Sequence, residues 1–195
     1  MGVRQGPPGA LAGRVSYLLE PKNWLVVTMV AVGAHGSGLA GAGWGLLAAF
    51  FAAVLPTAFV DYGIRRGRWA DRNVGERRAR LVVLAFITAS VAAGLILLVL
   101  LGAPVLLTRY LGLTLASVAV LAAITVVWKI SIHCATASGS VAILALLYGP
   151  PVLAGYLLVG LLAWARVAVR DHTVPQVAGG IVLGAAAAVL AYALL

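Results

Sequence analysis

Two histidines, His133 and His172, stand close to basic residues in a sequence that has little other charge. A histidine can serve as a nucleophile or as a proton donor near neutral pH. An arginine fork suits phosphate oxygens because it offers parallel donors and stays charged. Phosphoryl transfer needs cations for the charged oxygens, a nucleophile in line with the leaving oxygen, and an acid to protonate that oxygen. The residue types therefore indicate phosphoryl-transfer chemistry.

The basic residues gather in three polar segments, residues 61–80, 129–133 and 166–172. Besides the two histidines, these segments contain ten basic side chains: Arg65, Arg66, Arg68, Arg72, Arg77, Arg78, Arg80, Lys129, Arg166 and Arg170. A surface that collects them would be a basic pocket with two titratable groups. Whether the three segments meet depends on the elements between them.

The remainder of the chain is apolar. Hydrophobic residues make up 63% of the 195 residues and charged residues 10%, and the mean hydropathy is +1.08. A soluble domain has about 45–50% apolar and about 25% charged residues. Apolar blocks that approach the roughly 20 residues of a membrane span cover residues 24–34, 43–60, 81–101, 106–128, 135–147, 152–165 and 174–195. The sequence predicts an all-α, polytopic transmembrane bundle of six or seven helices.

We expect one transmembrane domain over residues 24–195, preceded by an N-terminal cytoplasmic or interfacial segment, 1–23, without a signal-peptide pattern. The Gly-rich stretch 35–43 separates the first two blocks, which are either two short helices or one interrupted helix, and we favour two. Gly149-Pro150-Pro151 predicts a tight turn, because two prolines remove backbone donors. Two helices then separate each polar segment from the next. All three segments are therefore expected on one face of the membrane.

The net charge of +9 is clustered between hydrophobic blocks, which argues against a nucleic-acid partner. The single cysteine, Cys134, excludes an internal disulfide, and no zinc-type cluster is present in the sequence. With seven helices, Arg4, Arg14 and Lys22 share a face with the polar segments, and the excess of positive charge places the site on the cytoplasmic side. With six helices the site would lie on the opposite side. We expect a multi-pass protein of the bacterial cell membrane with a cytoplasmic site; the sequence does not specify its oligomeric state.

Three short patterns follow one another along the chain. They are Arg65, six residues, then Arg72-Asn73; Ile130-Ser131-Ile132-His133; and Ala165-Arg166, five residues, His172, three residues, Gln176. In these patterns and their order the sequence resembles the type 2 phosphatidic acid phosphatases, membrane relatives of the vanadium haloperoxidases. The motifs of that family are Lys, six residues, Arg-Pro; Pro-Ser-Gly-His; and Ser-Arg, five residues, His, three residues, Asp. The resemblance covers the chain from about Arg65 to the C-terminus.

The resemblance implies a single phosphatase-like domain that hydrolyses a lipid phosphomonoester or diphosphate, of the polyprenyl diphosphate or phosphatidate type, through a phosphohistidine. It implies that His172 is the nucleophile and His133 the general acid, with Gln176 at the position of the aspartate that orients the nucleophile. The phosphate-binding residues by the same resemblance are Arg65, Arg72, Ser131 and Arg166. We add Lys129 to them because it is a basic residue of the same polar face. The partners it implies are the lipid substrate and the membrane, and it requires neither metal nor cofactor.

Gln176 departs from the family pattern because it brings no charge to stabilise a positive imidazole. Asp71, Glu76 or Asp171 could compensate, and the sequence does not choose among them. Two alternatives therefore stay open, a prenyl diphosphate transferase or lyase on the same scaffold, and a non-catalytic lipid-phosphate-binding membrane protein. A transporter or channel fits less well, because the charges collect at one face and not at the bilayer midplane.

Overall fold

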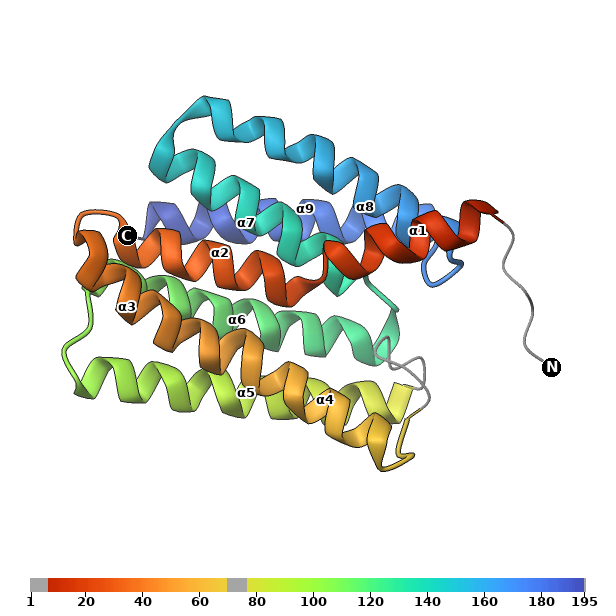
Figure 1. Ribbon diagram of the computed structural model, residues 1–195, viewed down its shortest axis with the longest axis horizontal. Coiled ribbons are helices and arrows are strands. Elements are labelled where there is room, and N and C mark those ends of the chain that lie inside the picture. The colour runs from red at the N-terminus through yellow and green to blue at the C-terminus, as the bar shows by residue number, and fades with distance from the viewer. Residues whose placement is uncertain (1–6, 70–76, 195) are drawn as a thin grey trace.

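The computed structural model describes residues 7–69 and 77–194, and every element in these ranges is helical (Figure 1). The elements are α1 (Pro7–Leu18), α2 (Pro21–Ala34), α3 (Gly38–Ala49), the π-helical turn η1 (Phe50–Val54), α4 (Leu55–Arg65), α5 (Arg77–Leu100), α6 (Val105–Val127), α7 (Ile132–Tyr148), the 3-10 turn η2 (Pro150–Gly155), α8 (Tyr156–Ala168) and α9 (Val174–Ala193). The expected all-α class is confirmed.

Seven helical segments run along the bundle in alternating directions. Five are long and apolar enough to cross a membrane: Gly38–Arg65, which joins α3, η1 and α4, then Arg78–Leu100, Val105–Val127, Pro150–Ala168 and Val174–Ala193. The other two segments are α2, with 14 residues, and α7, with 17. Of the two helix numbers that the sequence allowed, six and seven, the described part of the chain has seven.

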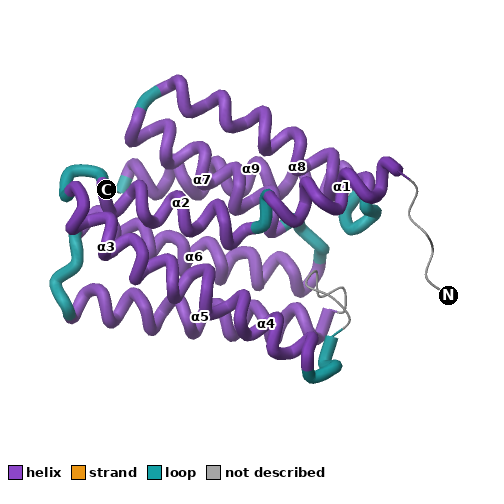
Figure 2. Tube along the Cα trace, viewed as in Figure 1, coloured by secondary structure: helices purple, strands orange, loops and turns teal. Residues whose placement is uncertain are grey.

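The loops lie at two ends of the bundle (Figures 1 and 2). One end, which we call the polar end, carries the end of α4, the start of α5, the α6–α7 connection and the α8–α9 connection. The described parts of all three polar segments lie there. The opposite end carries the α2–α3, α5–α6 and α7–η2 connections.

The first two apolar blocks form two separate helical segments, as favoured above: α2, and the span that joins α3, η1 and α4. His35, Gly36 and Ser37 make the turn between them, with Gly36 at a φ of 79°. The two helices then pack backbone to backbone, since a Cβ at Gly33 would collide with the Gly41 carbonyl. Small residues allow such close approach of helices in a membrane.

A π-helical turn interrupts the span that runs from α3 to α4. Pro56 follows this turn and has no N–H to donate to the preceding turn. The hydroxyl of Ser90 on α5 donates to the carbonyl of Phe51 at 2.6 Å. A backbone carbonyl without a partner is costly in lipid, so this bond between helices stabilises the irregular turn.

Helices α7 and α9 form the closest pair beneath the polar end. A Cβ at Gly184 would collide with the carbonyl of Ala135, and one at Gly180 with that of Ser131. The Gly180/Gly184 spacing therefore packs helices inside the bundle. Beside this pair a buried cluster joins α7, α8 and α9: Cys134, Ala137, Val141, Val159, Leu162 and Val177, with Leu19 and Trp24 packed against it.

The N-terminal helix α1 lies within the segment 1–23, for which the sequence predicted no helix. It packs against α8 at the polar end and is joined to α2 by only Leu19 and Glu20. Its buried residues Ala12 and Ser16 are one helical turn apart. This small stripe allows α1 to approach α8 closely.

Candidate functional site

The start of α7 is tied to the start of α9. Ser131 is the N-cap of α7, and its side chain accepts a hydrogen bond from the backbone N–H of Cys134 at 3.4 Å. The backbone N–H of Ser131 donates to the carbonyl of Gln176 at 3.2 Å. Both helices therefore begin side by side at the polar end. Helix N-termini carry partial positive charge and unpaired donors, which favour anions.

The end of α8 turns back sharply at Arg170, which has a φ of 59°. The N–H of Arg170 donates to the Val167 carbonyl at 2.9 Å, and the N–H groups of Asp171 and His172 donate to the Arg166 carbonyl at 3.2 and 3.3 Å. This is the hydrogen-bond pattern of a helix that ends in the left-handed conformation. The turn brings Asp171 and His172 next to the last turn of α8.

Arg166 is a buried arginine, with 3% of its surface exposed. Its Nη2 lies 2.9 Å from Oδ2 of Asp171, and its Nη1 donates to the hydroxyl of Ser16 on α1 at 2.7 Å. A buried guanidinium needs a counter-charge and hydrogen-bond acceptors. Asp171 supplies the first, and Asp171 and Ser16 together supply acceptors at both terminal nitrogens.

His172 lies in the turn between α8 and α9 and is held neutral at pH 7. Burial, followed by the nearby charges of Arg166 and Lys129, lowers its pKa to about 4, against smaller opposing effects of the Lys129 backbone and the Gln176 side chain. Within the described residues its Nδ1 is buried and forms no hydrogen bond. A neutral imidazole with an unengaged nitrogen can act as a nucleophile.

His133 lies in the first turn of α7, within electrostatic range of both Arg166 and His172. Arg80, near the start of α5, is within electrostatic range of Asp171. The two histidines are thus brought into one group with the Arg166–Asp171 ion pair. Four separate elements at the polar end, α5, α7, α8 and the α8–α9 turn, contribute to it.

Gln176 has a structural role as well as a place beside His172. It is the third residue of α9, and its Oε1 accepts the backbone N–H of Thr173 at 3.1 Å, while the Thr173 side chain caps the N–H of Gln176 in return. Such a reciprocal capping box fixes the first turn of a helix. The glutamine therefore holds rigid the turn on which His172 stands.

The predicted site residues fall into two groups in space. His133, His172, Lys129, Ser131, Arg166 and Gln176 gather around the starts of α7 and α9 and the end of α8. Arg65 lies exposed at the end of α4, which packs against η1 and α5. Arg72 lies outside the described residues, as do Asp71 and Glu76.

Three residues of the group were not among the predicted site residues: Ser16, Arg80 and Asp171. Asp171 was one of three acidic residues that the sequence could not rank, and the structure places it against Arg166. Nothing in the sequence distinguished Arg80 from the other arginines of the polar segment 61–80. No feature of the sequence indicated that Ser16 belongs to the site, because nothing in it predicted that α1 packs against α8.

Among the described residues, no three His, Cys, Asp or Glu side chains are grouped so that they could hold a metal ion. Comparison with protein-family models, with curated proteins and with solved structures found no match to this chain.

Proposed function

We propose that the protein is a membrane lipid phosphatase that hydrolyses a lipid phosphomonoester or diphosphate of the phosphatidate or polyprenyl diphosphate type. The observation that carries the proposal is the state of His172. Its pKa is about 4, its Nδ1 is unengaged within the described residues, and Arg166 and Lys129 are near enough to lower that pKa. A neutral imidazole beside two cations has the properties that attack on a phosphate group requires.

The proposed reaction has two steps. A nitrogen of His172 attacks the terminal phosphorus, and the bond from that phosphorus to the leaving oxygen, of the lipid alcohol or of the lipid phosphate, breaks. His133, which is protonated while the phosphate anion is bound beside it, gives its proton to that oxygen. A water molecule then attacks the phosphohistidine, His133 takes a proton from this water, and inorganic phosphate leaves. Arg166, Lys129 and the helix N-termini at Ser131 and Gln176 compensate the negative charge on the phosphate oxygens.

A phosphate that binds Arg166 has to compete with Asp171. The terminal nitrogens of this arginine already have oxygen partners, Asp171 at 2.9 Å and Ser16 at 2.7 Å. A phosphate that binds this guanidinium would use the nitrogen that Asp171 occupies. We therefore propose that Asp171 moves away from Nη2 when the substrate binds.

The proposed location of the site is the cytoplasmic face of a bacterial cell membrane. The described basic residues lie at or near the polar end, except for Arg109, which is in the first turns of α6 at the opposite end. Arginine and lysine are enriched in cytoplasmic loops. The test uses a membrane-impermeant maleimide on cells that carry Cys134→Ser together with either Arg68→Cys or Gly36→Cys. We expect Gly36→Cys to be labelled in intact cells and Arg68→Cys to be labelled only after lysis. The reverse pattern would place the site outside the cell.

Phosphate release by the purified protein in detergent tests the proposed reaction. The substrates are prenyl diphosphates and glycerolipid phosphates with EDTA present, and the variants are His172→Ala and His35→Ala. His35 is a matched control because it lies in the α2–α3 turn at the opposite end, where its ring packs against Tyr148. We expect release from wild type and His35→Ala but not from His172→Ala. Absence of release from every lipid by wild type rejects the phosphatase.

A further inference from the structure

The N-terminal helix α1 reaches the candidate site through one side chain. Ser16 is 7% exposed, and its hydroxyl accepts the hydrogen bond from Nη1 of Arg166 at 2.7 Å. The two residues are 150 positions apart in the sequence. α1 is also outside the part of the chain that carries the three motifs.

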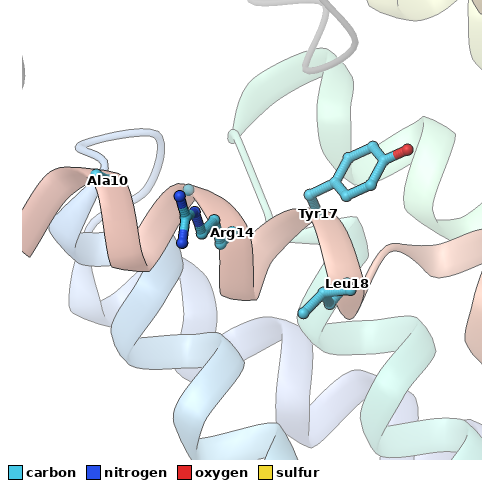
Figure 3. A pocket seen from close by; sticks show the side chains of 5 residues that line it. Ala10, Arg14, Tyr17 and Leu18 are labelled. Atoms are coloured by element: carbon cyan, nitrogen blue, oxygen red, sulfur yellow. The ribbon is translucent and has the colours of Figure 1, made fainter.

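The faces of α1 differ in what they contact. Ala12 and Ser16 are buried toward α8. Figure 3 shows Ala10, Arg14, Tyr17 and Leu18, which with Gly13 line an open hollow along α1. At 100° per residue these two stripes lie on opposite sides of the helix. The bond to Arg166 therefore depends on the rotation of α1, which its packing on α8 and the two-residue connection to α2 hold in place.

We infer that Ser16 is a positioning residue for the anion site: through its hydroxyl, α1 holds the guanidinium of Arg166 in the orientation that receives a phosphate group. The inference rests on the proposed function for the nature of the ligand. A hydroxyl has two acceptor lone pairs and one donor hydrogen, so Ser16 can accept from Arg166 and keep its hydrogen for a phosphate oxygen. The serine thus remains useful after the phosphate has displaced Asp171 from Nη2, and it keeps the freed arginine from turning away.

Loss of the Ser16 hydroxyl should weaken the binding of the phosphate anion without changing His172. Without Ser16, Nη1 of a buried arginine has one acceptor fewer, and the guanidinium turns toward Asp171, with which it forms the ion pair. A phosphate then has to displace a carboxylate that holds Arg166 more firmly. We expect weaker phosphate binding, while the neutral state of His172 and its chemistry stay as they are.

The test compares Ser16→Ala with Ser16→Cys and Ser16→Thr in the full chain in detergent. Cysteine nearly preserves the volume and removes the strong acceptor, whereas threonine keeps the hydroxyl. Gly13→Ala is the control on the same helix, because it lies on the exposed stripe and a Cβ there meets nothing within 4 Å. The measurements are the dissociation constants of inorganic phosphate and orthovanadate, the thermal unfolding midpoint, and KM and kcat on the best lipid substrate.

We expect Ser16→Ala and Ser16→Cys to raise the anion dissociation constants and KM about tenfold, the loss of one charge-assisted hydrogen bond, with kcat changed far less. Ser16→Thr and Gly13→Ala should bind as wild type does. If Ser16→Ala does not fold, the comparison of cysteine with threonine decides. Equal anion binding by the cysteine variant and wild type, or no anion binding by wild type, overturns the inference. Anion binding by wild type without phosphate release from any lipid overturns the proposed function instead, and the Ser16 comparison still decides the inference.

Discussion

Oδ2 of Asp171 lies 2.9 Å from Nη2 of Arg166, so the residue directly before the proposed nucleophile neutralises the arginine proposed to bind the substrate. The left-handed turn at Arg170 produces this contact by reversing the chain at the end of α8. A carboxylate and a phosphate group compete for such an arginine, and this competition leads to the first prediction.

Asp171→Asn should strengthen phosphate binding and weaken the fold. The amide keeps the shape but has no charge to compete with phosphate at Arg166, so the dissociation constant of inorganic phosphate should fall about tenfold. The buried arginine loses its counter-charge, which should lower the free energy of unfolding by about 3 kcal/mol. Titration calorimetry and denaturation in detergent measure the two effects. Asp61→Asn, which removes a carboxylate from α4, is the control. Weaker phosphate binding by Asp171→Asn would show that Asp171 supports the site and does not compete with phosphate for Arg166.

The low pKa of His172 predicts how activity depends on pH. The imidazole has to be neutral to attack phosphorus, and its pKa is about 4. From pH 7 down to about pH 5, protonation of His172 should therefore not slow phosphate release. The rate should fall as the pH approaches 4, because the imidazole then becomes protonated. Rates measured across this range in single-turnover mode isolate the first step. An acid limb centred near 6.5 would mean that His172 is not buried as described.

The same pKa predicts a change in stability. In the unfolded chain His172 has its ordinary pKa of 6.5, and in the folded chain about 4. Below pH 6.5 the unfolded state therefore binds a proton that the folded state excludes, so this residue destabilises the fold progressively as the pH falls from 6.5 to about 4. Unfolding of wild type and His172→Asn at pH 7.5, 6 and 5 measures it. The difference between the two proteins should change with pH; a constant difference would contradict the prediction.

Gln176→Glu should raise the pKa of His172 and move the acid limb of the rate profile toward neutral pH. The glutamate keeps the length and the capping oxygen that accepts the Thr173 N–H, and its negative charge favours the protonated imidazole. Gln176→Leu removes the cap and should cost about 1 kcal/mol of stability. The pH profiles and unfolding of both variants separate charge from capping. An unchanged acid limb in the glutamate variant would place Gln176 outside the electrostatic environment of His172.

Gly184→Val should separate α7 from α9 and lower the free energy of unfolding by about 3 kcal/mol. A Cβ at Gly184 would collide with the Ala135 carbonyl, and overpacking of a tight contact costs energy in this range. Because the same two helices carry Ser131 and Gln176, phosphate binding should weaken too. Gly160→Ala on the exposed side of α8, where a Cβ meets nothing within 4 Å, is the control and should leave both unchanged.

The architecture could be predicted because membrane spans are simple patterns. Apolar length, the turn at Gly149-Pro150-Pro151 and the alternation of direction were enough to place the three polar segments at one end. The helix α1 was missed because its sequence, with Pro7, Pro8 and several glycines, is a weak helix former. Its packing against α8 stabilises it, and that contact cannot be read from the residues of α1 alone.

The candidate site could be predicted only in part, for a different reason. His133, Arg166 and His172 are marked by residue type and spacing. The partner of Arg166 depends on the backbone of Arg170, a residue that rarely adopts a positive φ. Without knowledge of that turn, Asp171 cannot be preferred to Asp71 or Glu76 as the ion-pair partner of Arg166. Arg65 matches a family motif as Arg166 does, yet it lies exposed on α4, which packs against η1 and α5. The direction in which a helix presents a residue depends on how the whole bundle packs, so the motif alone could not place Arg65.

The π-helical turn Phe50–Val54 has a consequence for the arginines at the end of α4. Such a turn inserts one residue into an α-helix, and each inserted residue turns everything after it by about 100° around the axis. Asp61 and Arg65 therefore face their present directions because of an insertion two or three turns earlier, which the hydrogen bond from Ser90 to Phe51 maintains. Deleting one residue from this turn would leave the charges and the length of the span almost unchanged while rotating the whole basic end of α4 to another side of the bundle.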